Sequence, residues 1–182
     1  MAAQDIGEGQ LHGSHADRIG RPPVLSIALC TSLPACRAVT SLPASTTAAV
    51  WFSRAQASGD GTSPASPIGS SSGLDAVTKP GDVIILLASD DPLDGGVTLK
   101  PGQSLIGHAE AGRKPAVTNS NADRDGGNGD VLADDCKVLD VRIERTRASG
   151  VLGFNVTGAC LLGVDVASGP AIQIPLLPPP SV

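Results

Sequence analysis

A proline-glycine corner between two short apolar runs constrains this chain more than any other feature. The stretch GGVTLKPGQSLIG, residues 95–107, places Pro101 and Gly102 between the runs VTL and SLIG. Such a pair sets φ to about −65° and then to a positive value, which is the geometry of a type I or II turn, whereas two-residue hairpins favour the primed turns. The pair is therefore a poor hairpin and a good corner between two strands that belong to different sheets.

The same unit recurs further along the chain. The segments 130–143 (DVLADDCKVLDVRI) and 154–166 (FNVTGACLLGVDV) each contain a strand, a polar or small-residue corner, and a second strand. The second strands align without gaps, and their first residues, Leu105, Val138 and Leu161, lie 33 and then 23 residues apart. A spacing in the low twenties, with the longer interval absorbed by a loop, is typical of one turn of a parallel β-helix.

The remaining pattern favours an all-β fold in one domain. The chain has 182 residues, with 22 Gly, 15 Pro and only 17% charged residues, which fits many short strands better than helices. Residues 82–88 (DVIILLA) form a continuous apolar run that is typical of a parallel strand covered on both faces. Residues 70–82 predict one helical turn with a serine N-cap, ended by Pro80-Gly81. A net charge of −5 and 2% aromatic residues argue against a nucleic-acid partner.

Three segments differ in character along the chain. Residues 1–49 predict a leader or a disordered segment, because residues 1–23 show no periodicity. Within them, residues 24–36 (VLSIALCTSLPAC) have the length of the apolar core of an export signal and are too short to span a bilayer as a helix. Residues 50–174 predict the parallel coil, and residues 175–182 predict a proline-rich tail. We therefore expect an exported or cell-surface protein without a transmembrane span.

The chain also resembles a known family over roughly residues 50–166. It is similar to the N-terminal cap and first coils of right-handed parallel β-helix proteins of the pectate-lyase-like superfamily. That resemblance implies about three coils here, a chain that is a truncated form of a longer helix, and carbohydrate-related or surface-attachment roles. An open last coil predicts self-association through its strand edges. The matching residues are Gly59-Asp60-Gly61-Thr62 with Pro67, Gly81-Asp82, Gly95-Gly96, Leu99, Pro101-Gly102-Gln103 and Leu105-Ile106-Gly107.

Candidate chemistry lies on the predicted outer face of the coil. Period-two alternation predicts Leu139, Val141 and Ile143 inside and Asp140, Arg142 and Glu144 outside. On the next turn Asp165 aligns with Arg142, and this alignment predicts that the two side chains pair across adjacent strands. A solvated charged surface is the favoured interpretation of these residues, and a catalytic role is the alternative. The outer-face candidates are Asp140, Arg142, Glu144 and Asp165.

A glycine-rich loop offers the one candidate for a metal. Residues 123–130 (DRDGGNGD) supply hard oxygen ligands of the kind that calcium binds. They match neither the EF-hand nor the nonapeptide calcium repeat, so an ordinary loop is favoured and no cofactor is expected otherwise. The four calcium candidates are Asp123, Asp125, Asn128 and Asp130.

Two cysteines lie at similar corners one turn apart. Cys136 and Cys160 are 24 residues apart, and parallel neighbours about 4.8 Å apart fall in the Cα range that a disulfide allows. A disulfide between them is one interpretation. Two stacked buried thiols are the favoured alternative.

Three functional hypotheses remain open from the sequence. The first is a non-catalytic surface module with a structural, adhesive or carbohydrate-binding role, whose partner is a polysaccharide or another cell-surface component. The second is the N-terminal fragment of a polysaccharide lyase or glycoside hydrolase whose catalytic coils are missing. The third is a gene fragment with no independent role. No catalytic constellation in the sequence supports an enzyme, so the first hypothesis is favoured.

Overall fold

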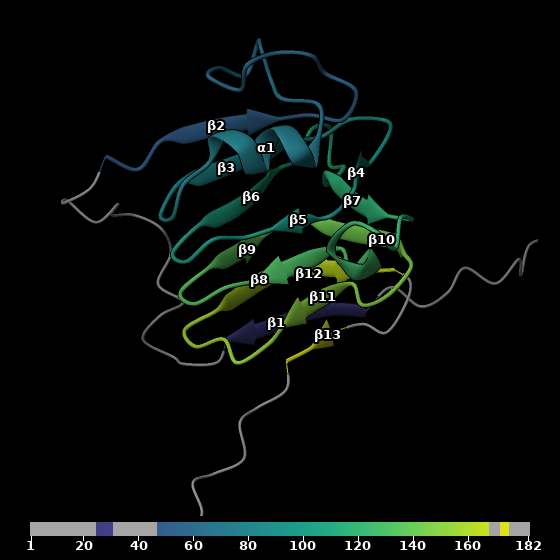
Figure 1. Ribbon diagram of the computed structural model, residues 1–182. Helices are drawn as coiled ribbons and strands as arrows, with labels where there is room; N and C mark the ends of the chain where they lie inside the picture. Colours follow the sequence, from purple (N-terminus) through teal and green to yellow (C-terminus); the bar gives the residue numbers. More distant parts are fainter. Residues whose placement is uncertain (1–24, 31–46, 168–171, 175–182) are drawn as a thin grey trace, which may run out of the picture.

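The computed structural model describes residues 25–30, 47–167 and 172–174, and these are mostly parallel β-strands. Figure 1 shows the strands stacked one above another from β2 at the top to β12 and β1 below. The elements are β1 (Leu25–Cys30), β2 (Val50–Ser53), α1 (Ser71–Val77), β3 (Val83–Leu87), β4 (Leu93–Asp94), β5 (Val97–Thr98), β6 (Ser104–His108), β7 (Ala116–Asn119), the 3-10 helix η1 (Asp125–Gly127), β8 (Asp130–Leu132), β9 (Lys137–Leu139), β10 (Arg142–Thr146), β11 (Val151–Gly153), β12 (Cys160–Val166) and β13 (Ile172–Gln173).

The strands fall into three parallel ladders that the chain visits in a fixed order. It passes through β3, β4 and β5, then β6, β7 and β8, then β9, β10 and β11, and finally β12 and β13. The first ladder is β2-β3-β6-β9-β12, the second is β4-β7-β10-β12, and the third is β5-β8-β11-β13. Strand β12 belongs to two ladders because its first half pairs with β9 and its second half with β10. This arrangement is consistent with a β-helix-like solenoid.

The predicted alignment of the second strands is confirmed. Leu105 lies opposite Val138, and Val138 lies opposite Leu161, as the spacings of 33 and 23 residues predict. The preceding turn is shorter, since Ile84 lies opposite Leu105. The longer turn contains β7 and the residue 120–129 loop. Each turn therefore keeps its ladder register while loops absorb the difference in length.

The Pro101-Gly102 corner is confirmed, and it recurs at the same height of each turn. Gly81, Gly102, Asp135 and Gly158 all have positive φ, at 82°, 72°, 56° and 68°. Their amides donate in series to the next turn, from Gly81 to the Pro101 carbonyl (2.9 Å) and from Gly102 to the Asp134 carbonyl (2.8 Å). The corner is thus a stacked column of left-handed residues, which glycine and aspartate tolerate.

A second corner corrects the predicted faces around residue 140. Asp140 has a φ of +53°, so it separates β9 from β10 and interrupts the period-two alternation. Val138, Val141 and Ile143 are fully buried, whereas Leu139 is half-buried and faces outward between Ile106 and Leu162. The prediction of Leu139 as an inward residue is therefore wrong, because it treated residues 139–143 as one unbroken strand.

Three interior columns form the core, with one residue from each turn in each column. In the first column, Ile84, Leu105, Val138 and Leu161 are at most 1% exposed. The second column contains Leu93, Val117, Ile143 and Val166. The third column differs, since Asp130 takes a place between Val97 and Val151.

The β2 end of the coil is closed by the predicted helix and a loop. Helix α1 begins after Ser70, whose hydroxyl accepts a hydrogen bond from the Gly73 amide at 3.1 Å, so the predicted serine cap is confirmed. Leu74 of α1 and Ile68 of the preceding loop pack into the core. The loop also covers the free edge of β2, since the Phe52 amide donates to the Gly61 carbonyl at 2.8 Å.

The other end of the first two ladders is covered by a strand from the predicted leader. Strand β1 pairs antiparallel with β12, from Leu25 opposite Val166 to Cys30 opposite Cys160. Residues 25–30 therefore form a strand of the sheet, and the leader over residues 1–49 stays a prediction. The rest of that predicted segment up to residue 46, and the tail 175–182, lie outside the described residues. In the parts of the chain that the structure covers, no helix is long and apolar enough to cross a membrane.

Candidate functional site

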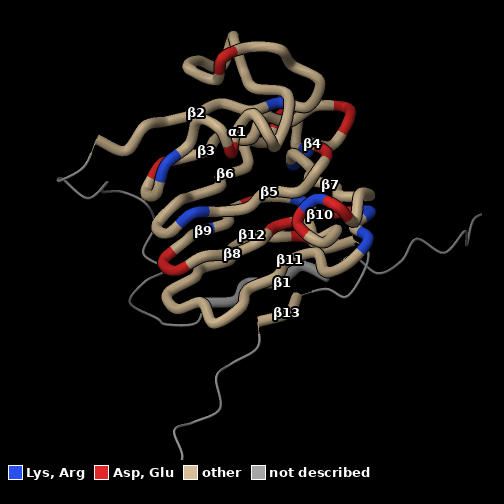
Figure 2. The backbone as a smooth tube through the Cα atoms, viewed as in Figure 1, with Lys and Arg blue, Asp and Glu red and all other residues tan. Residues whose placement is uncertain are grey.

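Charged side chains gather on the outer face of β10 and the second half of β12. Arg142 lies opposite Asp165 in the ladder, as predicted, and points outward because Val141 and Ile143 on either side point into the core. Figure 2 shows acidic and basic positions around the β10 label, where the residue 120–129 loop also lies. We call this surface the outer patch, defined as Lys114, Arg142, Glu144, Arg145 and Asp165.

Ion pairs fix the side chains of the outer patch. Glu144 binds two guanidinium groups, with Arg142 at 2.9 Å and Arg145 at 3.2 Å. Lys114 pairs with Asp165 at 3.0 Å and also donates to the Gly163 carbonyl at 2.7 Å. The two carboxylate side chains are only 20% and 18% exposed, whereas Arg142 and Arg145 are 46% and 65% exposed. The less exposed Glu144 carboxylate thus holds the guanidinium groups of Arg142 and Arg145 at the surface.

Asp140 does not join this group. Its backbone forms the corner between β9 and β10, and its amide donates to the Leu162 carbonyl at 2.9 Å. Its side chain lies against Gly163 on the next turn, so closely that a Cβ on that glycine would come within 2.3 Å of Asp140 Oδ1. The structure therefore brings together three of the four predicted outer-face residues. It adds Lys114 and Arg145, which carried no sequence signal beyond their charge.

The four calcium candidates do not converge. The Asn128 side chain accepts from the Ser149 amide at 3.0 Å and donates to the Asp125 carbonyl at 2.6 Å, so it serves to hold the loop. Asp130 points into the core. Among the described residues, no group of three or more His, Cys, Asp or Glu side chains is placed to hold a metal ion. Calcium binding by residues 123–130 therefore stays a prediction that this arrangement of carboxylates does not support.

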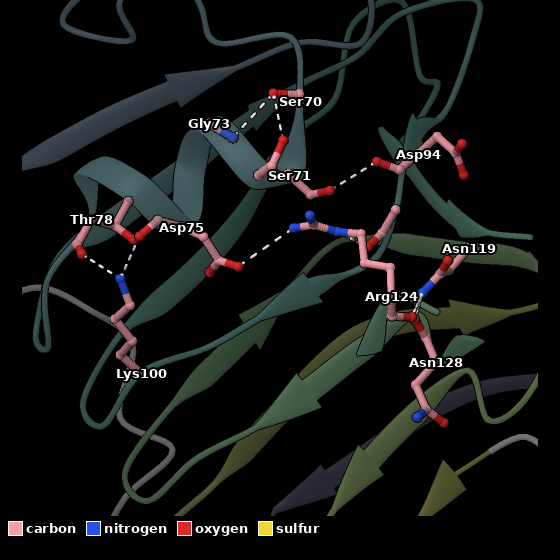
Figure 3. Close-up of polar contacts among 12 residues, drawn as sticks. Ser70, Ser71, Gly73, Asp75, Thr78, Asp94, Lys100, Asn119, Arg124 and Asn128 are labelled. Carbon is pink, nitrogen blue, oxygen red and sulfur yellow. Dashed lines mark hydrogen bonds and ion pairs between the residues drawn. The ribbon is translucent and has the colours of Figure 1, made fainter. Parts of the chain in front are cut away.

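The same loop is instead joined to the cap helix by a polar network that sequence reasoning missed. Fully buried Asn119 donates to the carbonyls of Arg124 (2.9 Å) and Asn128 (2.8 Å). Arg124 Nε donates to the Gly95 carbonyl at 2.7 Å, and its guanidinium reaches Asp75 of α1 at 3.4 Å. Figure 3 shows Arg124 between the helix and the loop. These contacts position the loop against the cap helix.

The predicted disulfide between Cys136 and Cys160 is wrong. Cys136 is a free, fully buried thiol, whereas Cys160 is disulfide-bonded. Burial raises the pKa of the Cys136 thiol to about 11, so it is an inert core residue at neutral pH. Similar positions at corners one turn apart were therefore not enough to predict a disulfide between these two cysteines.

Asp130 is the one fully buried carboxylate of the third interior column. It is 0% exposed, and neither side-chain oxygen has a hydrogen-bond partner among the described residues. Burial raises the pKa of this carboxyl to about 8. Because Val131 lies outward and Leu132 inward, the alternation of residues 130–132 could have placed Asp130 inside.

Comparison with known proteins adds no relative. Neither a protein-family model, nor a curated protein sequence, nor a solved structure matches this chain.

Proposed function

We propose that the chain is the cap and first coils of a right-handed parallel β-helix, related to the pectate-lyase-like superfamily, and that it acts as a non-catalytic surface module. The fixed order in which the chain visits three parallel ladders supports this fold. The stacked left-handed corners support it as well, because they repeat once per turn. Export is supported by the disulfide at Cys160, since disulfides persist in oxidising compartments.

We propose that the outer patch binds a carboxylated polysaccharide. The observation that carries this proposal is the Glu144 carboxylate holding Arg142 and Arg145, whose guanidinium groups are 46% and 65% exposed. A guanidinium forms two parallel hydrogen bonds with a carboxylate, and one already oriented by an ion pair loses less side-chain entropy on binding. With Lys114, the patch contains three basic and two acidic groups, which favours an anionic ligand.

Titration calorimetry with polygalacturonate, using a neutral β-glucan as the comparison polymer, tests the proposal. We expect binding to polygalacturonate alone, weakened by salt, and lost by about tenfold or more when Arg142 and Arg145 are both changed to Ala. Lys79→Ala is the matched control, because Lys79 is exposed at a turn remote in sequence from the patch. Equal affinity for both polymers, or unchanged affinity in the double variant, would contradict the proposal.

The enzyme-fragment hypothesis can be tested in the same samples. Glu144 and Asp165 are both engaged with basic side chains, which favours a positioning role over acid-base catalysis. We expect no release of shortened or unsaturated oligosaccharides from polygalacturonate, with or without added calcium. Release that disappears in Glu144→Gln would instead support a catalytic role.

A further inference from the structure

The third interior column contains an acid in a place that fits an aliphatic side chain. Asp130 pairs with Val97 on one side and Val151 on the other, and these valines are 3% and 0% exposed. The corresponding positions of the first column are occupied by aliphatic residues throughout. A carboxyl at this point contacts apolar neighbours both above and below it.

The buried amides of Gln103 and Asn119 have partners, whereas the Asp130 carboxyl has none among the described residues. Gln103 accepts from the Lys100 amide and donates to the Lys79 carbonyl, both at 2.8 Å. Asn119 donates to two carbonyls, as described above. Both Asp130 oxygens are buried without a hydrogen-bond partner in the described part of the chain. A buried carboxyl without partners is far less unfavourable as the neutral acid than as the anion.

Among the described residues, no basic group faces this carboxyl to stabilise its charge. Strands β5 and β11 place Val97 and Val151 beside it. The corner between β8 and β9 contains the free thiol of Cys136 and the exposed carboxylate of Asp134. Burial is the sole cause that raises the pKa of Asp130, and a charge on Asp130 would in turn raise the pKa of Cys136. The thiol is therefore a natural reporter of what happens at Asp130.

We propose that Asp130 is a pH-sensitive latch for the third ladder, which is closed most firmly in acid and loosens as the pH rises to mildly alkaline values. In the closed coil the carboxyl keeps its proton. When β8 separates from β5 and β11, water reaches the carboxyl and it ionises. Opening therefore releases one proton to solvent, and raising the pH favours opening.

The pH window follows from the two states of the carboxyl. An exposed aspartate ionises near its ordinary pKa of 3.8, and the buried one near 8. Between these values the open-to-closed ratio rises by at most about tenfold per pH unit, and above pH 8 it levels off because both states are then ionised. The opening of the third ladder therefore depends on pH between about 4 and about 8.

Alkylation of Cys136 in the full-length protein tests the latch. The protein is pulsed with iodoacetamide from pH 5 to pH 9, quenched and digested, and the Cys136 peptide is quantified by mass spectrometry. The intrinsic rise of thiol reactivity with pH is removed by dividing the wild-type rate by that of Asp130→Asn at each pH. We expect this ratio to rise by up to about tenfold per unit and to level off near pH 8. A ratio that stays constant would overturn the proposal.

Two further measurements keep the proposal testable if Asp130→Asn folds poorly. Asp130→Val restores the aliphatic column and serves as a second reference, while Asp134→Asn is the matched control that should retain the wild-type pH dependence. Hydrogen exchange should show faster opening with pH in β5, β8 and β11 and no such change in β3 and β6. A carboxyl titration of Asp130 by carbon NMR with a midpoint near 4 would also overturn it.

Discussion

The first and third interior columns are built by the same repeating backbone, yet they differ in what they bury. Ile84, Leu105, Val138 and Leu161 make the first column wholly aliphatic, whereas Asp130 interrupts the third. Aliphatic burial stabilises the fold at any pH, because no proton is exchanged when the residues become exposed. A buried acid makes the stability of its column depend on pH. The ladder geometry therefore fixes where side chains point and leaves their chemistry free to vary.

The largest expected effect is the pH dependence of unfolding. Because the pKa of Asp130 is raised from 3.8 to about 8 in the fold, its contribution is most favourable below pH 4 and is lost as the pH rises toward 8. The loss is at most roughly 6 kcal/mol of unfolding free energy. Urea unfolding at pH 4, 6 and 8 measures it as the difference between wild type and Asp130→Asn. If the unfolding free energies of the two proteins change with pH in parallel, Asp130 does not make the stability of the third column depend on pH.

The aliphatic column gives the next largest effect. Leu105→Ala leaves a cavity at a fully buried position and should lower the unfolding free energy by about 3 kcal/mol. The loss should be the same at pH 4 and pH 8. Ile106→Ala, at the half-buried outward position beside it, is the control and should cost clearly less. A loss at Leu105 that changes with pH would contradict the proposed difference between the columns.

A buried polar residue with partners should behave like the aliphatic column. Asn119→Ala removes two donated hydrogen bonds and should lower the unfolding free energy by about 2 kcal/mol, independent of pH. Hydrogen exchange in residues 120–129 should rise with it, since Asn119 holds this loop. Asn121→Ala is the matched control at an exposed position. Equal effects of the two substitutions would show that the Asn119 network does not position the loop.

The smallest effect is expected on the outer face. Glu144→Gln breaks ion pairs to partly exposed arginines and should change the unfolding free energy by less than about 1 kcal/mol, with the difference reduced by salt. Thermal unfolding at low and high ionic strength measures this. Glu110→Gln, which disturbs a longer and more exposed pair with Arg54, should have no measurable effect. A larger loss of unfolding free energy in Glu144→Gln would mean that the ion pairs of the outer patch stabilise the fold.

Much of the ladder arrangement was predictable because local pattern and spacing carry it. The Pro101-Gly102 corner, the serine-capped helix and the alignment of Leu105, Val138 and Leu161 all follow from short stretches of sequence. The error at Leu139 arose where one left-handed residue, Asp140, broke the alternation. Aspartate adopts a positive φ only in some contexts, so the sequence pattern could not reveal that corner.

The candidate site was predictable in part for the same reason. Arg142 and Asp165 were aligned by the 23-residue spacing, and their register is confirmed. Lys114 reaches Asp165 from a separate turn, and nothing local to either residue indicates that contact. The acidic loop looked like a ligand set because its composition does not show where its side chains point.

By itself the sequence determined the mostly β character, the corners and the register of the stacked turns, because these depend on backbone preferences and on the spacing of apolar residues. Only the tertiary structure decided that residues 25–30 cover β12, that Cys136 stays a free thiol, and that Asp130 is enclosed with no hydrogen-bond partner in the described part of the chain. Each of these depends on which distant segments come into contact. Contacts of that kind are fixed by packing across turns, where burial and the loss of water act on residues that are far apart in the chain.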